Sequence, residues 1–527
     1  MHRFWMLSSI LAACPAAKDS GAPADSGPAD LDGDGFDVTT DCDDADPAVF
    51  PGAVEVPRDG VDNDCDPATC SGASFEPSTS AWALPAVYGA EASLPFDQAA
   101  SFASCTDNTP AHTLADVSGD DRLDLVVTFV CGDEATGDTR WLVHGGGEAG
   151  FTEAATDWTL PNEYGEEGAA PFANAVAAEV CGDGIPAHTF TDVTGDGLPD
   201  LVITQVCDDE TVGRDHWLVH AGSSAGFEDS PAAWTLPGGY GEDGYTPFVA
   251  TAGSASCLKG IPTYGLADLT GDGATDLIVS TSCSDDAVGE THWVVYPGNG
   301  SGFGAATSWA LPAGLAEEGE APLPALSGLT SCGEAIVGHD TRDLDGDGRL
   351  DLVVTETCDD DPTVGDTRWL VYPGGASGFA AASTDYLLPT AYGAASTTPF
   401  SNTSDLASVS DDTPGHELVD LDGDARLDLV ITEVPSDPNV GTGLWAVHFG
   451  GSTGFAEASW PWTLPAIAGT TPLGAPHTSA DCAVGHPAWT LLDLDGDALL
   501  DLIVTESCAD ATVGDAAWER YESACAE

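Results

Sequence analysis

The sequence predicts an all-β protein built as a six-bladed β-propeller, and three observations lead to this fold class. An acidic nonapeptide recurs six times, and its first aspartates are 76, 76, 75, 77 and 73 residues apart. Each repeat contains four short stretches rich in β-branched and aromatic residues, and none shows a sustained helical period. The last repeat lacks its fourth stretch, whereas a matching stretch precedes the first repeat. The first aspartates are Asp116, Asp192, Asp268, Asp343, Asp420 and Asp493.

The second repeat shows the order of elements within one unit. Strand-forming stretches lie at 186–188, 201–204, 217–220 and 234–237, and Gly, Asp and Pro separate them. Because each unit buries its apolar face only against its neighbours, six such units indicate an array. Radial repetition leaves only short sheet edges, which favours a propeller. The alternative is an open solenoid, which would leave two unpaired edges.

The ring is expected to close through the segment before the first repeat. Residues 71–85 align with residues 222–237, including a Phe and a Trp-x-Leu-Pro sequence. The sixth repeat ends after Trp518 and Tyr521 without these features. We therefore expect residues 75–84 to form the outer strand of the sixth blade. The propeller as a whole is predicted over residues 70–527.

The cysteines follow the same repeat. Five pairs are each 26 residues apart and flank an acidic loop at fixed offsets, and the fifth repeat has Val409 and Pro435 instead. The joint loss of both partners predicts disulfides that clamp one hairpin per blade. Cys42 with Cys65, and Cys70 with Cys525, are further candidates. The five pairs are Cys105 and Cys131, Cys181 and Cys207, Cys257 and Cys283, Cys332 and Cys358, and Cys482 and Cys508.

The N-terminal region has the pattern of an export signal. A short basic start precedes an apolar stretch, and Leu-Ala-Ala-Cys at 11–14 resembles the lipobox of bacterial lipoproteins. This resemblance implies a signal peptide over 1–13, acylation of Cys14 and a lipid-anchored protein of the bacterial cell envelope. The alternative is an ordinary secretory signal with an incidental Cys. Residues 14–29 are polar and rich in Gly, Pro and Ser, as in a flexible tether.

Residues 30–69 form a separate acidic module with two cysteines. Asp30, Asp32, Asp34 and Asp41 occupy positions 1, 3, 5 and 12 of an EF-hand-like loop, in which Gly35 would make the turn. The segment resembles a short metal-binding module of exported bacterial proteins. Oxygen ligands suit a hard cation such as Ca²⁺, although aspartate at position 12 is shorter than the usual glutamate. A solvated acidic linker is the alternative.

The six acidic loops resemble the cation loops of FG-GAP/VCBS repeats, the blade type of integrin α-subunit propellers. The resemblance implies Ca²⁺ bound by side chains at positions 1, 3, 5 and 9, in a loop between the first and second strands. The fourth loop combines four carboxylates with a glycine at position 6, so we expect it to bind best. The implied ligands are Asp116, Asp120 and Asp124; Asp192, Asp196 and Asp200; Asp268, Asp272 and Asp276; Asp343, Asp345, Asp347 and Asp351; Asp420, Asp422, Asp424 and Asp428; and Asp493, Asp495, Asp497 and Asp501.

The charge of the chain restricts its partners. Twelve Lys and Arg against 88 Asp and Glu give a formal net charge of −76. Such a surface repels nucleic acid and anionic lipid, so we expect no nucleic-acid partner and membrane contact only through an N-terminal lipid. The charge suits a saline, calcium-rich exterior, and a halophilic surface is the alternative explanation. We expect a monomer.

The sequence contains no recognisable catalytic motif. His112, His188, His339 and His416 share one repeat position with Tyr264 and Trp489, which favours packing over metal binding. His144, His220 and His448 alternate with tyrosines in the same way. Two functions remain open. The first is a Ca²⁺-stabilised surface module that binds protein or glycan without catalysis, and the second is a hydrolase or lyase acting on polysaccharide.

Overall fold

The computed structural model divides the chain into two compact units, residues 1–71 and residues 72–527. It describes residues 36, 47, 49 and 51 of the first unit. In the second unit it describes residues 74–75, 79–89, 93–106, 108–165, 169–242, 244–315, 321–358, 361–393, 398–410, 412–467, 473–474, 480 and 486–524. All regular elements in these ranges are strands. No helix in the described part of the chain is long and apolar enough to cross a membrane.

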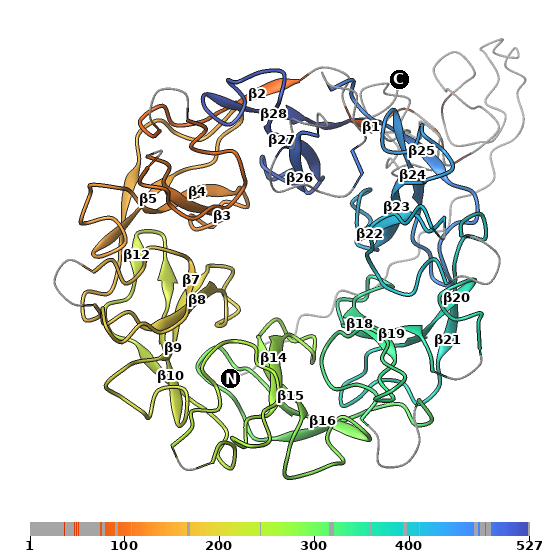
Figure 1. Ribbon diagram of the computed structural model, residues 1–527, viewed down its shortest axis with the longest axis horizontal. Coiled ribbons are helices and arrows are strands. Elements are labelled where there is room, and N and C mark those ends of the chain that lie inside the picture. Colours follow the sequence, from red (N-terminus) through yellow and green to blue (C-terminus); the bar gives the residue numbers. More distant parts are fainter. Residues whose placement is uncertain are drawn as a thin grey trace, which may run out of the picture. The chain divides into compact units, whose positions relative to one another are not determined.

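The second unit is a six-bladed β-propeller, as predicted (Figure 1). The first strand of each blade lies nearest the axis of the ring and the fourth lies farthest out. The first strands are β3 (Ala111–Ala115), β8 (Ala187–Thr191), β14 (Thr263–Ala267), β18 (Gly338–Arg342), β22 (Gly415–Val419) and β26 (Ala488–Leu492). The second strands are β4 (Asp124–Phe129), β9 (Asp200–Gln205), β15 (Asp276–Thr281), β19 (Asp351–Glu356), β23 (Asp428–Glu433) and β27 (Asp501–Glu506).

The outer half of each blade is equally regular. The third strands are β5 (Arg140–His144), β10 (His216–His220), β16 (His292–Tyr296), β20 (Arg368–Tyr372), β24 (Leu444–His448) and β28 (Ala517–Tyr521). The fourth strands are β6 (Thr156–Thr159), β13 (Ala232–Thr235), β17 (Thr307–Ala310), β21 (Thr384–Leu387), β25 (Trp460–Thr463) and β2 (Ser80–Ala83). The remaining short strands are β1 (Ser74–Phe75), β7 (Val176–Ala177), β11 (Gly222–Ser223), β12 (Gly226–Phe227) and β29 (Ser523–Ala524).

The sixth blade is closed by the N-terminal side of the propeller, which confirms the predicted closure. Strand β2 pairs antiparallel with β28, and Trp82 lies opposite Trp518. The same Trp pairing joins the third and fourth strands of the second blade, where Trp217 lies opposite Trp234. The predicted outer strand over 75–84 is shorter than expected, because β2 spans only Ser80–Ala83 and Phe75 belongs to β1.

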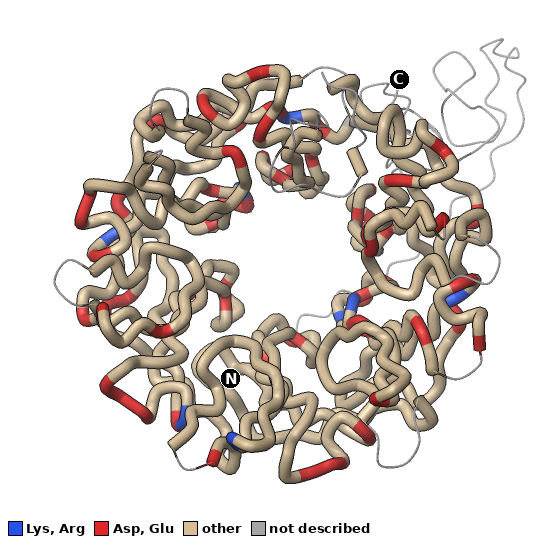
Figure 2. Tube along the Cα trace, in the orientation of Figure 1, with Lys and Arg blue, Asp and Glu red and all other residues tan. Residues whose placement is uncertain are grey.

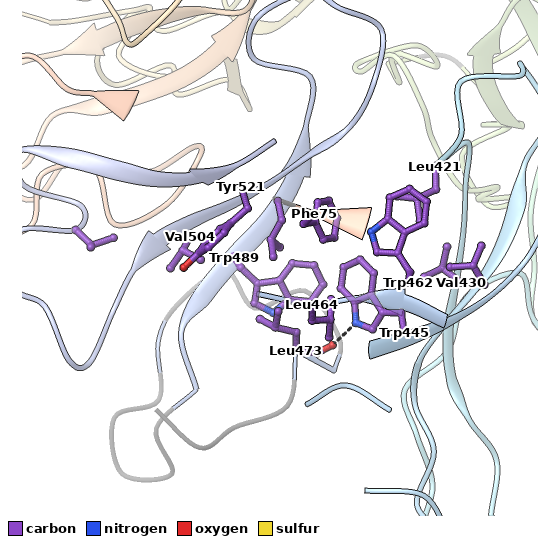
Figure 3. Packing of buried hydrophobic residues seen from close by; sticks show 13 residues of the cluster. Phe75, Leu421, Val430, Trp445, Trp462, Leu464, Leu473, Trp489, Val504 and Tyr521 are labelled. Carbon is purple, nitrogen blue, oxygen red and sulfur yellow. Dashed lines mark hydrogen bonds between the residues drawn. The ribbon is translucent and has the colours of Figure 1, made fainter. Parts of the chain in front are cut away.

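Phe75 completes a second repeated feature of the ring. In five blades a Phe that follows the third strand packs edge-on against two aromatic rings of the preceding blade, as Phe227 does against Trp141 and Trp158. Phe75 does the same against Trp445 and Trp462 of the fifth blade (Figure 3). Its strand β1 pairs with both β25 and β29. The N-terminal segment therefore supplies both elements that the sixth repeat lacks.

The hydrophobic core lies between neighbouring blades. Each of six clusters combines apolar side chains of two successive blades, and the last cluster joins the sixth blade to the first through Trp82, Ile503 and Leu125. The third-strand Trp of every blade is buried and donates its indole N–H to a backbone carbonyl, for example from Trp518 to Phe96 at 2.7 Å. Because these cores are shared, no blade buries its apolar face alone.

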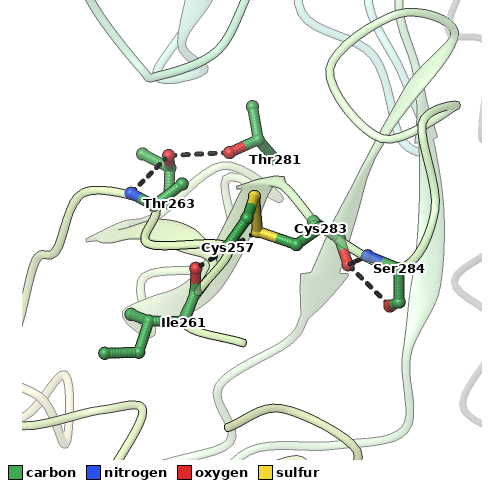
Figure 4. The surroundings of a disulfide bond; sticks show 8 residues. Cys257, Ile261, Thr263, Thr281, Cys283 and Ser284 are labelled. Carbon is green, nitrogen blue, oxygen red and sulfur yellow. Dashed lines mark hydrogen bonds between the residues drawn. A yellow bond between two sulfur atoms is a disulfide. The ribbon is translucent and has the colours of Figure 1, made fainter. Parts of the chain in front are cut away.

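Four of the predicted disulfides are confirmed. Each joins the segment before the first strand to the segment after the second strand, and the paired Cα atoms are 5.2–5.4 Å apart. Figure 4 shows the bridge between Cys257 and Cys283, beside which Thr281 Oγ1 donates to Thr263 Oγ1 at 2.7 Å. Cys508 is also disulfide-bonded. Its expected partner Cys482, like Cys14, Cys42, Cys65, Cys70 and Cys525, lies outside the described residues.

Candidate metal centre

The six acidic loops connect the first and second strands of the blades, where the resemblance placed them. In every loop the aspartate at position 1 accepts the backbone N–H groups of positions 4 and 6, at 2.7–2.9 Å. The aspartate at position 5 accepts the N–H of position 7. These hydrogen bonds fold each loop into a tight turn and fix two of its carboxylates.

The aspartate at position 9 begins the second strand and is buried in every blade. In loop one, Asp124 Oδ1 accepts the N–H of Gly146 at 2.8 Å, and Oδ2 accepts the N–H of Val117 at 3.1 Å. The equivalent residues of loops two to five make the same two bonds. The position 9 carboxylate thus ties its loop to the turn that follows the third strand.

Burial raises the pKa of these position 9 carboxyl groups, because desolvation disfavours their charged form. The pKa rises to about 6 for Asp351 and to about 7 for Asp428 and Asp501, and it is also raised for Asp124, Asp200 and Asp276. Neighbouring loop aspartates add to the effect. A bound cation would favour the ionised form and oppose this shift.

Three loops bring carboxylate oxygens close enough to share one ion. The groups are Asp343, Asp345 and Asp347; Asp420, Asp422 and Asp428; and Asp493, Asp495 and Asp497, each with ligand atoms within 4.8 Å of one another. These are the loops with aspartate at position 3. The first three loops have Ser118, Thr194 or Thr270 there and form no such carboxylate triad within residues 116–276 as the structure describes them.

The donor set of loops four and five fits a hard divalent cation. All candidate donors are oxygens, which suits Ca²⁺ or Mg²⁺ rather than a thiophilic metal. Burial, and to a smaller extent the neighbouring Asp424 and Asp420, raise the pKa of Asp428, and a bound cation would oppose this rise. A different group, Glu179 with Cys181 and Cys207, is not a comparable site, because the two sulfur atoms form a disulfide.

Neighbouring loops contact each other around the ring. The position 4 glycine of each loop lies against position 6 or 7 of the next, so that a Cβ added at Gly195 would be 2.5 Å from the carbonyl oxygen of Gly273. The sixth loop meets the first in the same way, and Arg122 Nε donates to the carbonyl oxygen of Asp495 at 3.0 Å. The six loops therefore form one continuous circle, which the sequence alone did not reveal.

The histidines expected to pack do so. His112, His188, His339 and His416 are buried, and each places Nε2 2.9–3.0 Å from a backbone carbonyl oxygen. Tyr264 reaches the equivalent carbonyl of Ala250 with its hydroxyl group, at 3.1 Å. His144, His220 and His448 each contact a tyrosine hydroxyl through Nε2 at 2.8–3.0 Å. These contacts give both histidine positions a structural role.

Acidic residues also occur far from the loops. Figure 2 shows Asp and Glu around both the inner and outer margins of the ring, with few Lys and Arg among them. The loop aspartates therefore account for only part of the charge. The EF-hand-like ligands Asp30, Asp32, Asp34 and Asp41 lie outside the described residues.

Comparison with known proteins supports the metal-binding character of the first unit. Residues 41–69 match a family model whose description is "Putative metal-binding motif". The match includes Asp41 and begins after Asp30, Asp32 and Asp34. No curated protein sequence matches the chain.

Solved structures resemble the propeller at low identity. A Photorhabdus luminescens Tc holotoxin pore shares 16% identity over 86% of this chain, with a TM-score of 0.45, and the chain spans only 15% of that protein. An Agrocybe aegerita lectin that recognises terminal N-acetylglucosamine shares 15% identity over 75% of this chain and 74% of its own, with a TM-score of 0.35. A Fusarium graminearum α-L-arabinofuranosidase shares 10% identity over 76% of this chain and 88% of its own, with a TM-score of 0.28.

Proposed function

We propose that this protein is an exported, lipid-anchored and Ca²⁺-stabilised FG-GAP/VCBS-type propeller that binds a neutral glycan at the cell surface without catalysis. One observation carries the choice of ligand. In a chain of net charge −76, a pocket of about 430 Å³ between the inner segments of the first and second blades is lined by no acidic or permanently charged residue. A site from which charge is missing in so acidic a protein suits an uncharged ligand.

The lining of this pocket combines an aromatic side chain with amide groups. Phe102 is 76% exposed at the pocket and offers a flat apolar surface. Gln98 and Asn174 line it from successive blades, and their side-chain amides make no hydrogen bond with other described residues. Each amide has both a donor and an acceptor, which suits the adjacent hydroxyl groups of a sugar ring. His112 is also present, and burial lowers its pKa, which favours the uncharged imidazole.

A second pocket at the equivalent place provides a natural comparison. It lies between the third and fourth blades, has a volume of about 320 Å³ and is also uncharged. Ala250 and Ala325 occupy the positions of Gln98 and Asn174, and Ser254 occupies that of Phe102. The second pocket therefore lacks both amides and the exposed aromatic ring of Phe102, since its one aromatic lining residue, Tyr264, is buried. We propose that the ligand binds the first pocket.

Neither pocket offers the groups that a polysaccharide hydrolase needs. Glycoside hydrolysis generally requires two carboxyl groups placed on either side of the scissile bond. No Asp or Glu lines either pocket. These two sites therefore support recognition of a glycan rather than its cleavage. Export and anchoring rest on the sequence pattern at 1–14, which lies outside the described residues.

Calcium is proposed to stabilise the propeller through loops four and five. A cation that binds only the folded loops raises the free energy of unfolding by mass action. Millimolar Ca²⁺ should therefore raise the melting temperature and EDTA should lower it. Asp347→Ala should reduce the bound calcium.

A glycan array tests the proposed ligand. Full-length protein is applied to an array of neutral and charged glycans, with Ca²⁺ or with EDTA. We expect neutral glycans to bind, and Phe102→Ala and Asn174→Ala to weaken binding at least tenfold. Ser254→Ala in the second pocket is the matched control and should bind normally.

Three outcomes would contradict separate parts of the proposal. Normal glycan binding by both pocket variants, or binding of no neutral glycan, would exclude the proposed ligand site. A melting curve insensitive to EDTA, with no calcium found by elemental analysis, would exclude the metal. Equal membrane retention of Cys14→Ser and wild type after cell fractionation would exclude the lipid anchor.

A further inference from the structure

The sixth acidic loop differs from its siblings through a residue of the neighbouring third strand. Two positions after the third-strand Trp, five blades have a buried valine and the sixth has Arg520. Arg520 is itself 2% exposed. Replacing a buried methyl-bearing side chain by guanidinium requires a compensating negative environment. The valines are Val143, Val219, Val295, Val371 and Val447.

Arg520 finds this environment inside the sixth loop. Its Nε donates to Asp501 Oδ2 at 2.6 Å, and its Nη2 donates to Asp495 Oδ2 at 2.5 Å. In loops one to five the equivalent oxygen of the position 9 aspartate accepts the backbone N–H of position 2. The guanidinium thus binds two carboxylate oxygens of the sixth loop. In the other loops the equivalent oxygens accept backbone N–H groups or are available to bind a cation.

The position of Arg520 matters for the closure of the ring. The centre of its guanidinium lies 5.4 Å from the centre of the Trp82 ring, on the strand that closes the sixth blade. Arg520 also lies opposite Ser80 in the pairing of β28 with β2. The positive charge therefore contacts both the acidic loop and the closing strand, and a guanidinium over an indole face is attracted by the ring electrons.

We propose that Arg520 is a permanent internal cation of the sixth loop, and that this loop therefore takes no calcium while loops four and five do. The comparison with loops four and five rests on the metal binding proposed above. Guanidinium keeps its charge at all physiological pH values, whereas bound Ca²⁺ depends on its concentration. A divalent ion at Asp495 would meet repulsion from Arg520 and would compete for oxygens already used.

This arrangement makes the seam of the ring, the pairing of β2 with β28, independent of calcium. In the fourth blade, removal of calcium would leave Asp343, Asp345 and Asp347 facing one another, and the nearby Arg426 donates from Nε only to the backbone carbonyl of Asp345, at 3.4 Å. In the sixth blade, Arg520 remains beside Asp495 and Asp501. When calcium is removed, the fourth and fifth blades should therefore open locally first, while the closing strands β2 and β28 remain paired.

The test exchanges the two residue types between blades. Arg520→Val gives the sixth blade the residue of its siblings, and Val371→Arg gives the fourth blade an arginine at the equivalent position. Calcium binding to the full-length protein is measured by equilibrium dialysis with Ca²⁺ alone. Amide hydrogen exchange is followed in β19 and β27, with Ca²⁺ and with EDTA.

We expect EDTA to accelerate exchange at least tenfold in β19 of the wild type and to leave β27 unchanged. Arg520→Val should bind one more calcium per chain and make β27 sensitive to EDTA. Val371→Arg should bind one calcium fewer and make β19 insensitive. If β27 responds to EDTA as strongly as β19 in the wild type, or if Arg520→Val gains no calcium, the inference is wrong.

The proposal can still be tested if a variant fails to fold or if the wild type binds no calcium. If Arg520→Val does not fold, the wild-type exchange pattern and Val371→Arg still decide whether guanidinium excludes calcium. If the wild type binds no calcium, the proposed metal function fails, and Arg520→Val in EDTA then tests the internal cation alone. Faster exchange confined to β27 supports it, and unchanged exchange overturns it.

Discussion

Position 6 of the acidic loops shows how one backbone angle limits sequence choice. The angle φ is positive in all six loops, from 64° at Asp121 to 86° at Gly197. Glycine adopts this conformation without steric cost, whereas a residue with a Cβ atom does so at a cost of about 1–2 kcal/mol. Three loops nevertheless have Asp121, Ala425 or Ala498 there. Those loops keep the turn because the position 1 carboxylate accepts the N–H of position 6.

Paired substitutions at this position should have opposite effects on stability. Ala425→Gly should raise the free energy of unfolding by up to about 1 kcal/mol, since it removes the strained conformation. Gly197→Ala should lower it by a similar amount, and by φ alone, because no atom lies within 4 Å of the Cβ that it introduces. Urea unfolding of both variants measures the difference. Shifts of the same sign would contradict this explanation.

The hairpin formed by the first and second strands is the unit that the disulfides reinforce. In the third blade, isolated bridges pair Ser256 with Ile261 and Ser282 with Asp285, directly beside the two cysteines. The fifth blade has the same bridges at the equivalent positions, Ser408 with Thr413 and Val434 with Asp437. Its backbone therefore has the conformation of a disulfide-bonded hairpin without the disulfide.

A disulfide should consequently form in the fifth blade when both cysteines are supplied. Val409→Cys with Pro435→Cys closes a loop of the same length as in the other blades, and the loop-entropy account gives about 3.5 kcal/mol. Val409 is 85% exposed, so its replacement removes little packing. Non-reducing peptide mapping and thermal unfolding measure the outcome. Val409→Cys alone is the control, and a double variant no more stable than this control would refute the expectation.

The sequence predicted the elements better than the contacts between them. The fixed repeat, the alternation of residue types and the cysteine offsets act within one blade, so four strands could be predicted for each blade and a hairpin disulfide for all but the fifth. The closing strand was predicted because residues 71–85 resemble 222–237. The circle of touching loops and the pocket near Phe102 depend on how neighbouring blades pack, which no local pattern encodes.

Arg520 is an intermediate case. Its departure from five valines is visible in the sequence, and that signal could have drawn attention to the sixth loop. Its consequence could not be predicted, because it depends on the guanidinium reaching Asp495 and Asp501 at 2.5 and 2.6 Å. Comparison of the six repeats also gave loops four, five and six aspartate at the same four positions. Only the structure distinguishes the surroundings of these loops.

At the scale of the whole molecule, the ring depends on residues that are far apart in the chain. Removal of residues 70–85 takes away β1 and β2 together, which exposes an edge of β28 and the aromatic rings around Trp445. We expect this deletion to abolish the single cooperative unfolding transition and to promote aggregation. Calorimetry and light scattering would measure both effects.

The matched control removes residues 15–65, which lie in the first compact unit. This deletion should leave the unfolding transition of the propeller unchanged. A cooperative transition of normal enthalpy after deletion of 70–85 would show that the five complete blades are stable without closure.

The strand pairing at the seam also fixes the order in which the protein can mature. Each hairpin disulfide joins cysteines 26 residues apart, so it can form soon after that part of the chain is made. The pairing of Ser80–Ala83 with Ala517–Tyr521 cannot form until more than four hundred further residues have been synthesised. Until then Trp82 lacks Trp518, its partner across the closing strand pair. Every nascent chain therefore passes through an open-ringed stage in which the edge of β2 is unpaired, and the synthesis of β28 determines when the ring can close.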